Sequence, residues 1–268
     1  MDRRLTMVTT IGVAAITLLV FRAFAPAPFP NPVPKEILPV RAIDQRIQEM
    51  RFEFNVQIFY RFDPALFFPP KWRNRPYFGK GKQISESDLD RAVAVCKQFL
   101  SEHPKPVIQK NLTHIFLLGD LEFNGLQYGG TYIQSAIYVM SDGLAKGYTV
   151  DFLRSMCHAE FSSILFRNYP FPSDEWSQLN PKDFRYGNSG AEFLRQDNVR
   201  GTSDELQSNG FLIKYSQSTL EDDFNVMTEW LFAKPAELES VAERFEVIRK
   251  KREIAIRFYQ SIDPNYHF

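Results

Sequence analysis

The sequence has few cysteines and no net charge. Its two cysteines, Cys96 and Cys157, allow at most one disulfide in 268 residues, which excludes a scaffold built on disulfides. Both fall in segments with a helical pattern, where we expect two buried thiols that behave as small apolar side chains; in an exported domain they could instead pair. Lysine plus arginine and aspartate plus glutamate each total 32. Because neither sign of charge dominates, we expect no nucleic-acid partner.

An uncharged run near the N-terminus has the layout of a membrane signal. Two arginines precede it, and it extends from Leu5 to Phe21. As a helix, its 17 residues span roughly 25 Å, the short limit for crossing a hydrocarbon core. Cleavage after Ala25 would place Pro26 at the start of the mature chain, so we favour an uncleaved signal anchor over a cleaved signal peptide. The arginines predict a cytoplasmic N-terminus, with the bulk of the chain in a periplasm or lumen.

The sequence divides into three parts. Residues 1–24 are the signal anchor or signal peptide, and residues 25–40 are a proline-rich linker. Such a run favours extended polyproline II and acts as a semi-rigid spacer, which would hold the domain off the membrane. Residues 41–268 are enough for a domain with a real hydrophobic core.

Hydrophobic patterns in residues 41–268 predict an α+β domain. The predicted elements are a helix over 41–50, a strand over 52–58, a loop over 64–82, a helix over 85–101, strands over 114–118 and 129–140, a helix over 149–168, a loop over 171–210, and helices over 219–232 and 235–260. Strands that precede a helix, a long loop and further helices are typical of the α+β class. The run Arg249-Lys250-Lys251-Arg252 on the last helix predicts a solvated basic face.

The helix predicted over residues 149–168 carries the residues with chemistry. Leu153, Cys157, Phe161 and Leu165 recur at helical spacing and predict its buried face. Glu160 lies within this apolar pattern. A carboxylate is costly to bury unless it is paired or binds a metal, so Glu160 indicates a polar cleft or a metal site.

The spacing around Glu160 can be compared with that of a zinc peptidase helix. Such a helix places two histidines four residues apart, with a glutamate beside the first to deprotonate the zinc-bound water. With Glu160 in the glutamate position, the two histidine positions fall on Ala159 and Ser163. His158 lies about 100° around the helix from Ala159. It is either a hydrogen-bonded helix histidine or a metal ligand, and His114 is the one other histidine that we consider as a ligand.

Several short motifs follow this helix in a fixed order. They are Asn180-Pro181, Phe184, Tyr186, Gly210-Phe211, Tyr215 and Glu221-Asp222-Asp223-Phe224, after Glu160-Phe161 on the helix itself. Over roughly residues 129–232, this order resembles the zinc-binding metallopeptidases of the gluzincin type. Their pattern is a His-Glu-Phe helix, a loop with Asn-Pro and aromatic residues, then Gly-Phe, Tyr and an acidic Glu-Asp-Phe helix.

The resemblance implies a zincin-like domain, with a small mixed sheet and a central helix of the active-site type. It also implies Zn2+ as cofactor and peptide-bond hydrolysis with Glu160 as the general base. The family's third ligand maps onto Asp222, with Glu221 as its substitute, and His158 would be the histidine ligand. One histidine with carboxylates binds zinc more weakly than three strong ligands.

The resemblance therefore leaves three kinds of function open. The first is a membrane-anchored zinc metallopeptidase outside the cytoplasm. The second is an inactive pseudopeptidase that binds a peptide or a protein partner in the cell envelope, with residues 132–140 as the edge strand to which the partner adds. The third is a purely structural envelope protein.

Overall fold

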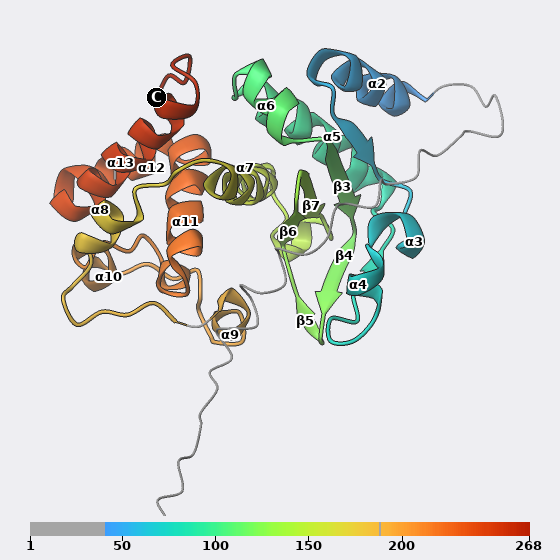
Figure 1. The fold of residues 1–268 in the computed structure, drawn as a ribbon. Helices are drawn as coiled ribbons and strands as arrows, with labels where there is room; N and C mark the ends of the chain where they lie inside the picture. The colour runs from blue at the N-terminus through green and yellow to red at the C-terminus, as the bar shows by residue number, and fades with distance from the viewer. Residues whose placement is uncertain (1–40, 188) are drawn as a thin grey trace, which may run out of the picture. The chain divides into compact units, whose positions relative to one another are not determined.

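The computed structural model describes residues 41–187 and 189–268. The predicted signal segment and proline-rich linker, residues 1–40, lie outside this part of the chain. No helix within the described residues is long and apolar enough to cross a membrane. The described chain is a mixed sheet flanked by helices on one side of helix α7 and a group of helices on its other side (Figure 1).

A mixed sheet of four strands forms the centre of the N-terminal half. Its order is β1-β3-β7-β6, in which β1, β3 and β7 are parallel and β6 is antiparallel to β7. The strands are β1 (Gln57–Phe59), β3 (His114–Leu118), β6 (Gly130–Ile133) and β7 (Ala136–Met140). Strand β7 is buried along its whole length, as expected of a strand covered on both faces, whereas β6 is partly exposed at the sheet edge.

The segment 129–140 is a hairpin and not the single strand that its pattern predicts. Gln134 has a φ of 52°, in the left-handed region, and the chain reverses between Ile133 and Ala136. A two-residue hairpin turn needs such a backbone because it must match the twist of its strands. The prediction of 132–140 as one edge strand is therefore wrong, since β6 lies at the edge and β7 lies inside the sheet.

A second, antiparallel sheet contains β2 (Lys80–Lys82), β4 (Asp120–Phe123) and β5 (Leu126–Gln127). Strands β4 and β5 are joined through Asn124 and Gly125, which both have positive φ angles of 52° and 75°. Asn-Gly favours such a hairpin turn, and the strand pair that it joins was not predicted from the sequence pattern.

Three of the predicted helices have their predicted bounds to within one residue. They are α5 (Glu86–Ser101), α7 (Val150–Asn168) and α11 (Leu220–Ala233). Each begins after a serine or threonine whose side-chain oxygen accepts a backbone N–H three residues later, namely Ser85, Thr149 and Thr219. These caps satisfy donors that the first helical turn leaves free, which is why the starts could be predicted from local sequence.

Other elements differ from their predictions. Helix α2 (Ala42–Phe54) is longer than predicted and ends where Asn55 adopts a left-handed backbone. The two predicted loops contain short helices, and another short helix follows α5: α3 (Pro64–Phe67), α4 (Pro70–Arg73), α6 (Lys105–Asn111), α8 (Ser173–Gln178), α9 (Gly190–Phe193) and α10 (Asp204–Ser208). The predicted last helix is broken at Phe245 into α12 (Pro235–Arg244) and α13 (Glu246–Ile262).

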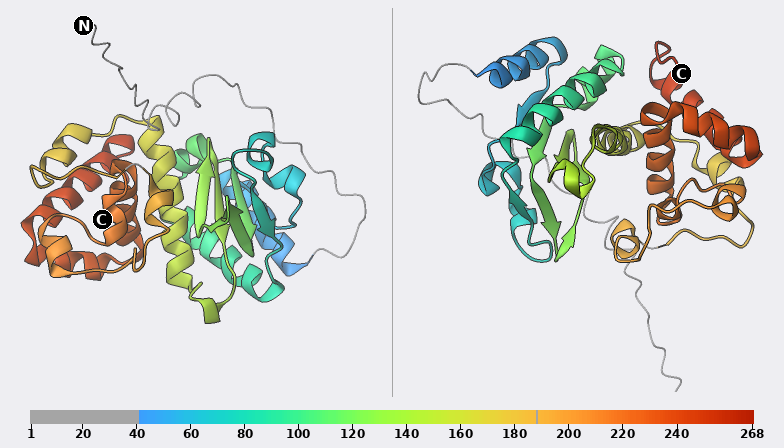
Figure 2. Two further views of the ribbon diagram at one scale, coloured as in Figure 1. Left: turned by 90° about the horizontal axis from the view of Figure 1, so that it is seen from below. Right: turned by 180° about the vertical axis from the view of Figure 1, so that it is seen from behind.

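Helix α7 lies between the strands and the C-terminal helices (Figures 1 and 2). It packs against β6 and β7 of the sheet, against α5, and most extensively against α11. Cys157 on α7 and Cys96 on α5 are both free, buried thiols, as the helical pattern around them predicts.

A buried ion pair joins α13 to α11. Lys251 is fully buried, and its Nζ donates to Asp223 Oδ2 at 2.7 Å and to the carbonyl of Gly210 at 2.8 Å. The same carboxylate oxygen accepts from Trp176 Nε1 at 2.9 Å and from the Tyr186 hydroxyl at 2.8 Å. Burial lowers the pKa of Lys251, and the Asp223 charge opposes that shift. The prediction of a solvated face is therefore wrong at Lys251. Through Asp223, its ion pair connects α13 and α11 to Trp176 of α8 and to Tyr186, and Lys251 also contacts Gly210.

We expect Lys251→Met to lower the free energy of unfolding by about 3–5 kcal/mol, because it leaves the buried Asp223 carboxylate without its cation. Lys250→Met is the matched control. The Lys250 side chain is 47% exposed and pairs with Glu246 one turn away, so its loss should cost less than about 0.5 kcal/mol. Urea unfolding measures both values, and equal stability of the two variants would show that the pair contributes nothing.

Candidate functional site

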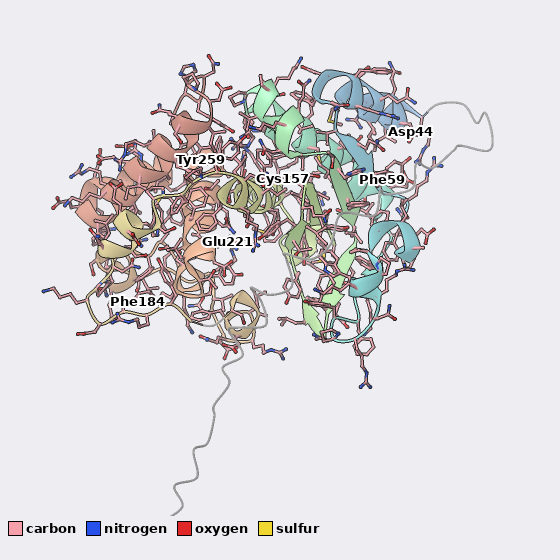
Figure 3. The ribbon with its side chains drawn as sticks, viewed as in Figure 1. Asp44, Phe59, Cys157, Phe184, Glu221 and Tyr259 are labelled. Carbon is pink, nitrogen blue, oxygen red and sulfur yellow. The ribbon has the colours of Figure 1, made fainter. Side chains whose placement is uncertain are left out.

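Helix α7 directs its predicted site residues to two different faces. Glu160 faces β6, where a Cβ atom added to Gly130 would lie 2.8 Å from Glu160 Oε1. His158 faces α5 and hydrogen-bonds to Glu102 just beyond its end. Residues two apart on a helix point in widely different directions, so the structure does not bring His158 and Glu160 together. Figure 3 labels Cys157 on α7 and Glu221 on α11, the two helices that contain most of the site.

Both ring nitrogens of His158 are engaged. Its Nε2 lies 2.8 Å from Glu102 Oε2, and its Nδ1 lies 3.1 Å from His103 Nε2. The ring is fully buried and stacks on Phe232, with ring centroids 4.4 Å apart. His158 is therefore a hydrogen-bonded helix histidine in this structure, and a metal ion could reach it only by replacing one of these hydrogen bonds.

The hydrogen bonds continue to the C-terminal segment. His103 Nδ1 lies 2.8 Å from the Tyr266 hydroxyl. One assignment of protons satisfies the whole chain: Tyr266 donates to His103, His103 donates to His158, and His158 donates to Glu102. This assignment needs two neutral rings, and burial lowers the pKa of both histidines. Burial alone would raise the pKa of Glu102, but hydrogen bonds from His158 and Arg154 lower it to about 2.

Glu160 lies among other carboxylates. Burial raises its pKa well above the ordinary value, and the charges of Asp222, Glu229 and Glu221 on α11 add to the effect. Among the described residues, none donates a hydrogen bond to the Glu160 carboxylate. The structure therefore brings the predicted general base close to the predicted acidic ligands of α11, and leaves that base without a partner.

The α11 carboxylates already have partners. Asp222 Oδ2 accepts from Ser218 Oγ at 2.7 Å and Thr219 Oγ1 at 2.8 Å, and its Oδ1 accepts from the Tyr215 hydroxyl at 3.3 Å. Glu221 accepts from the Tyr132 hydroxyl and from Arg167 Nη2, the latter at 3.1 Å. Another α11 carboxylate, that of Glu229, is buried and paired with Arg200. Glu229 was not predicted as a site residue from the sequence. The one sequence feature that could have indicated it is its position on the same helix as Glu221 and Asp222.

Ala159 and Ser163, the two histidine positions in the register predicted from the sequence, provide no free metal-binding atom. Ala159 has no metal-binding atom. Ser163 Oγ accepts a hydrogen bond from Asn225 Nδ2 at 2.7 Å, and Asn225 Oδ1 accepts one from Ser162 Oγ at 2.6 Å. Asn225, on α11, was not identified from the sequence either. It fills the space between the two helices with an amide that bonds to both serines.

These residues do not fit a zinc ion. A zinc site needs three or four nitrogen, sulfur or oxygen ligands around one point. Within residues 41–187 and 189–268, no three His, Cys, Asp or Glu side chains come together to hold a metal. His114, on β3, lies with its Nδ1 2.7 Å from Thr113 Oγ1, and it is not part of such a group.

We expect Glu160→Gln to raise the melting temperature at pH 8 and to leave it almost unchanged near pH 4.5. The folded-state pKa of Glu160 is raised, so its contribution to stability is present at low pH and is lost as the pH rises through that pKa. Glutamine removes the cost of the charge. Glu53→Gln, at an exposed position of α2, is the control and should show no such pH dependence. An unchanged or lower melting temperature of Glu160→Gln at pH 8 would contradict the desolvated carboxylate.

Comparison with known proteins gives a likeness in fold. No family profile matches the sequence, and no curated protein matches it. A solved crystal structure, that of a "putative zinc-binding metallo-peptidase" from Bacteroides caccae ATCC 43185, has a similar fold with a TM-score of 0.55. The similarity covers 82% of this chain and 84% of that chain, at 15% sequence identity. At this identity the likeness extends to the fold alone. The described chain therefore has a metallopeptidase-like α+β fold.

Proposed function

We propose that this protein is a non-catalytic peptide-binding module built on a metallopeptidase fold. The observation that carries this proposal is the state of the three ligand positions. Ala159 has no donor atom, Ser163 is hydrogen-bonded to Asn225, and Asp222 accepts three hydrogen bonds. A chain that keeps the fold but fills these positions with hydrogen bonds is suited to holding a peptide and not to cutting it.

The edge strand β6 is the proposed binding surface. Within the described residues, no strand pairs with its outer edge, and all four of its residues are partly exposed. Backbone groups of alternate residues in β6 point away from β7, because an antiparallel pair uses every second residue for each neighbour. An extended peptide can use these groups by adding as a further strand, which is a common mode of peptide recognition.

Two glycines shape the approach to this edge. A Cβ atom at Gly129 would lie 2.9 Å from the Phe152 ring and 3.2 Å from Met156 Sδ, and one at Gly130 would meet Glu160. Glycine thus allows the start of β6 to lie directly on α7. A peptide paired with β6 would lie beside an apolar part of α7 at one end and beside Glu160 further along.

The competing function is zinc-dependent peptide hydrolysis, with Glu160 as general base and His158, Asp222 or Glu221 as ligands. It requires one tightly held zinc ion for each chain. We expect instead that the purified full-length protein, loaded with zinc and dialysed into metal-free buffer, retains less than about a tenth of an equivalent. Retention of about one equivalent, with peptide cleavage that Glu160→Gln abolishes, would establish the hydrolase and refute our proposal.

The binding arm of the same test uses an array of defined, unstructured peptides. The best binder should be recovered intact. Single N-methylation along it should weaken binding at least about tenfold at every second residue, because only alternate backbone N–H groups face β6. Equal tolerance of N-methylation at all positions would rule out strand addition.

We also propose that the N-terminal segment anchors the domain at the membrane, outside the cytoplasm. The support is the sequence of residues 1–40, with its uncharged run, its preceding arginines and its proline-rich linker. The full-length chain should remain in the membrane fraction after an alkaline carbonate wash, and protease added outside the cytoplasmic membrane should digest residues 41–268. Release by carbonate, or protection from the protease, would contradict this topology.

A further inference from the structure

Asn225 lies between the two helices that surround the site. It projects from α11, is 9% exposed, and hydrogen-bonds through both atoms of its amide to consecutive serines of α7. Ser162 Oγ donates to Asn225 Oδ1 at 2.6 Å, and Asn225 Nδ2 donates to Ser163 Oγ at 2.7 Å. Ser162 Oγ is also within 2.7 Å of the carbonyl of Ala159. The amide therefore spans the gap at one of the two positions where a zinc helix carries its histidines.

From this geometry we infer that Asn225 is a positioning residue that replaces the structural role of a metal ion. A metal ion bound by both helices would fix their separation and rotation. Asn225 supplies the same cross-link without a metal. This inference rests on the proposed function, in which the site holds no metal ion and the two helices are joined by hydrogen bonds instead.

Because both serines are buried, water cannot replace the amide of Asn225 as their hydrogen-bond partner. Ser162 is fully buried and Ser163 is 1% exposed, so a hydroxyl without a partner could not turn to water. An aliphatic residue at 225 would leave Ser163 Oγ without its amide donor, whereas Ser162 Oγ would keep only the carbonyl of Ala159, on its own helix. Helix α7 in turn carries Glu160 beneath the start of β6, so the bridge sets the position of α7 against the proposed peptide-binding edge.

The test compares Asn225→Ala with Ser162→Ala/Ser163→Ala and with the triple variant, all in the full-length chain. If one bridge contains all three side chains, the losses in melting temperature are not additive: Asn225→Ala should lower it by several degrees in the wild type and by much less in the double-serine background. Chelator should leave the melting temperature of the wild type unchanged. Additive losses, or a fall with chelator that zinc reverses, would overturn the inference.

A second readout separates positioning from general stability. Thr228→Ala, also buried on α11 but 3.4 Å from the Tyr259 hydroxyl of α13, is the matched control. Asn225→Ala should weaken capture of the array-selected peptide about tenfold, whereas Thr228→Ala should change it less than about twofold. Equal effects of the two variants would overturn the positioning role. If the wild type captures no peptide, the proposed function fails, while the melting series still decides the bridge.

Discussion

Most of α7 is enclosed by the sheet, α5 and α11, so its buried polar side chains depend on partners inside the protein. A buried hydroxyl or ring nitrogen without a partner costs on the order of 1–3 kcal/mol. The structure meets this requirement from both sides of the helix. Glu102 and His103 satisfy His158 on the side of α5, and Asn225 satisfies both serines on the side of α11. The positions of the surrounding elements follow from these contacts.

Among the described residues of α7, Ser155 Oγ is buried without a hydrogen-bond partner, and the partly exposed Glu160 is the second departure from this pattern. It has no hydrogen-bond donor among the described residues, and its neighbours are carboxylates that carry their own partners. Natural proteins retain such unfavourable groups mainly at functional sites. Its position beside the start of the edge strand β6 is the observation that most favours binding at this part of the molecule.

Fold and chemistry can be separated in this protein. A likeness at a TM-score of 0.55 and 15% identity is compatible with a shared arrangement of strands and helices around a central helix. The chemistry of a zinc peptidase depends on a few side chains, and in the register that the sequence predicts around Glu160 the two histidine positions carry Ala159 and Ser163. A fold supports many functions, so the site must be argued from its own residues.

The sequence by itself determined the features that depend on neighbouring residues. The starts of α5, α7 and α11 follow from caps that bond three residues ahead, and the Asn124-Gly125 turn follows from two adjacent backbone conformations. The helical patterns also predicted the burial of Cys96 and Cys157. The order of the predicted strands and helices indicated the α+β class, since it follows from hydrophobic patterns along the chain.

Only the tertiary structure decided where the polar side chains point. The sequence left two interpretations of His158, and its partners lie 55 and 56 residues upstream. It placed Lys251 on a solvated face, whereas that ammonium pairs with a carboxylate 28 residues away. It gave no sign of the break at Phe245, which has neither proline nor glycine beside it. Local hydrogen bonds are encoded within a few residues, but the partner of a buried polar group comes from whichever distant segment packs against it.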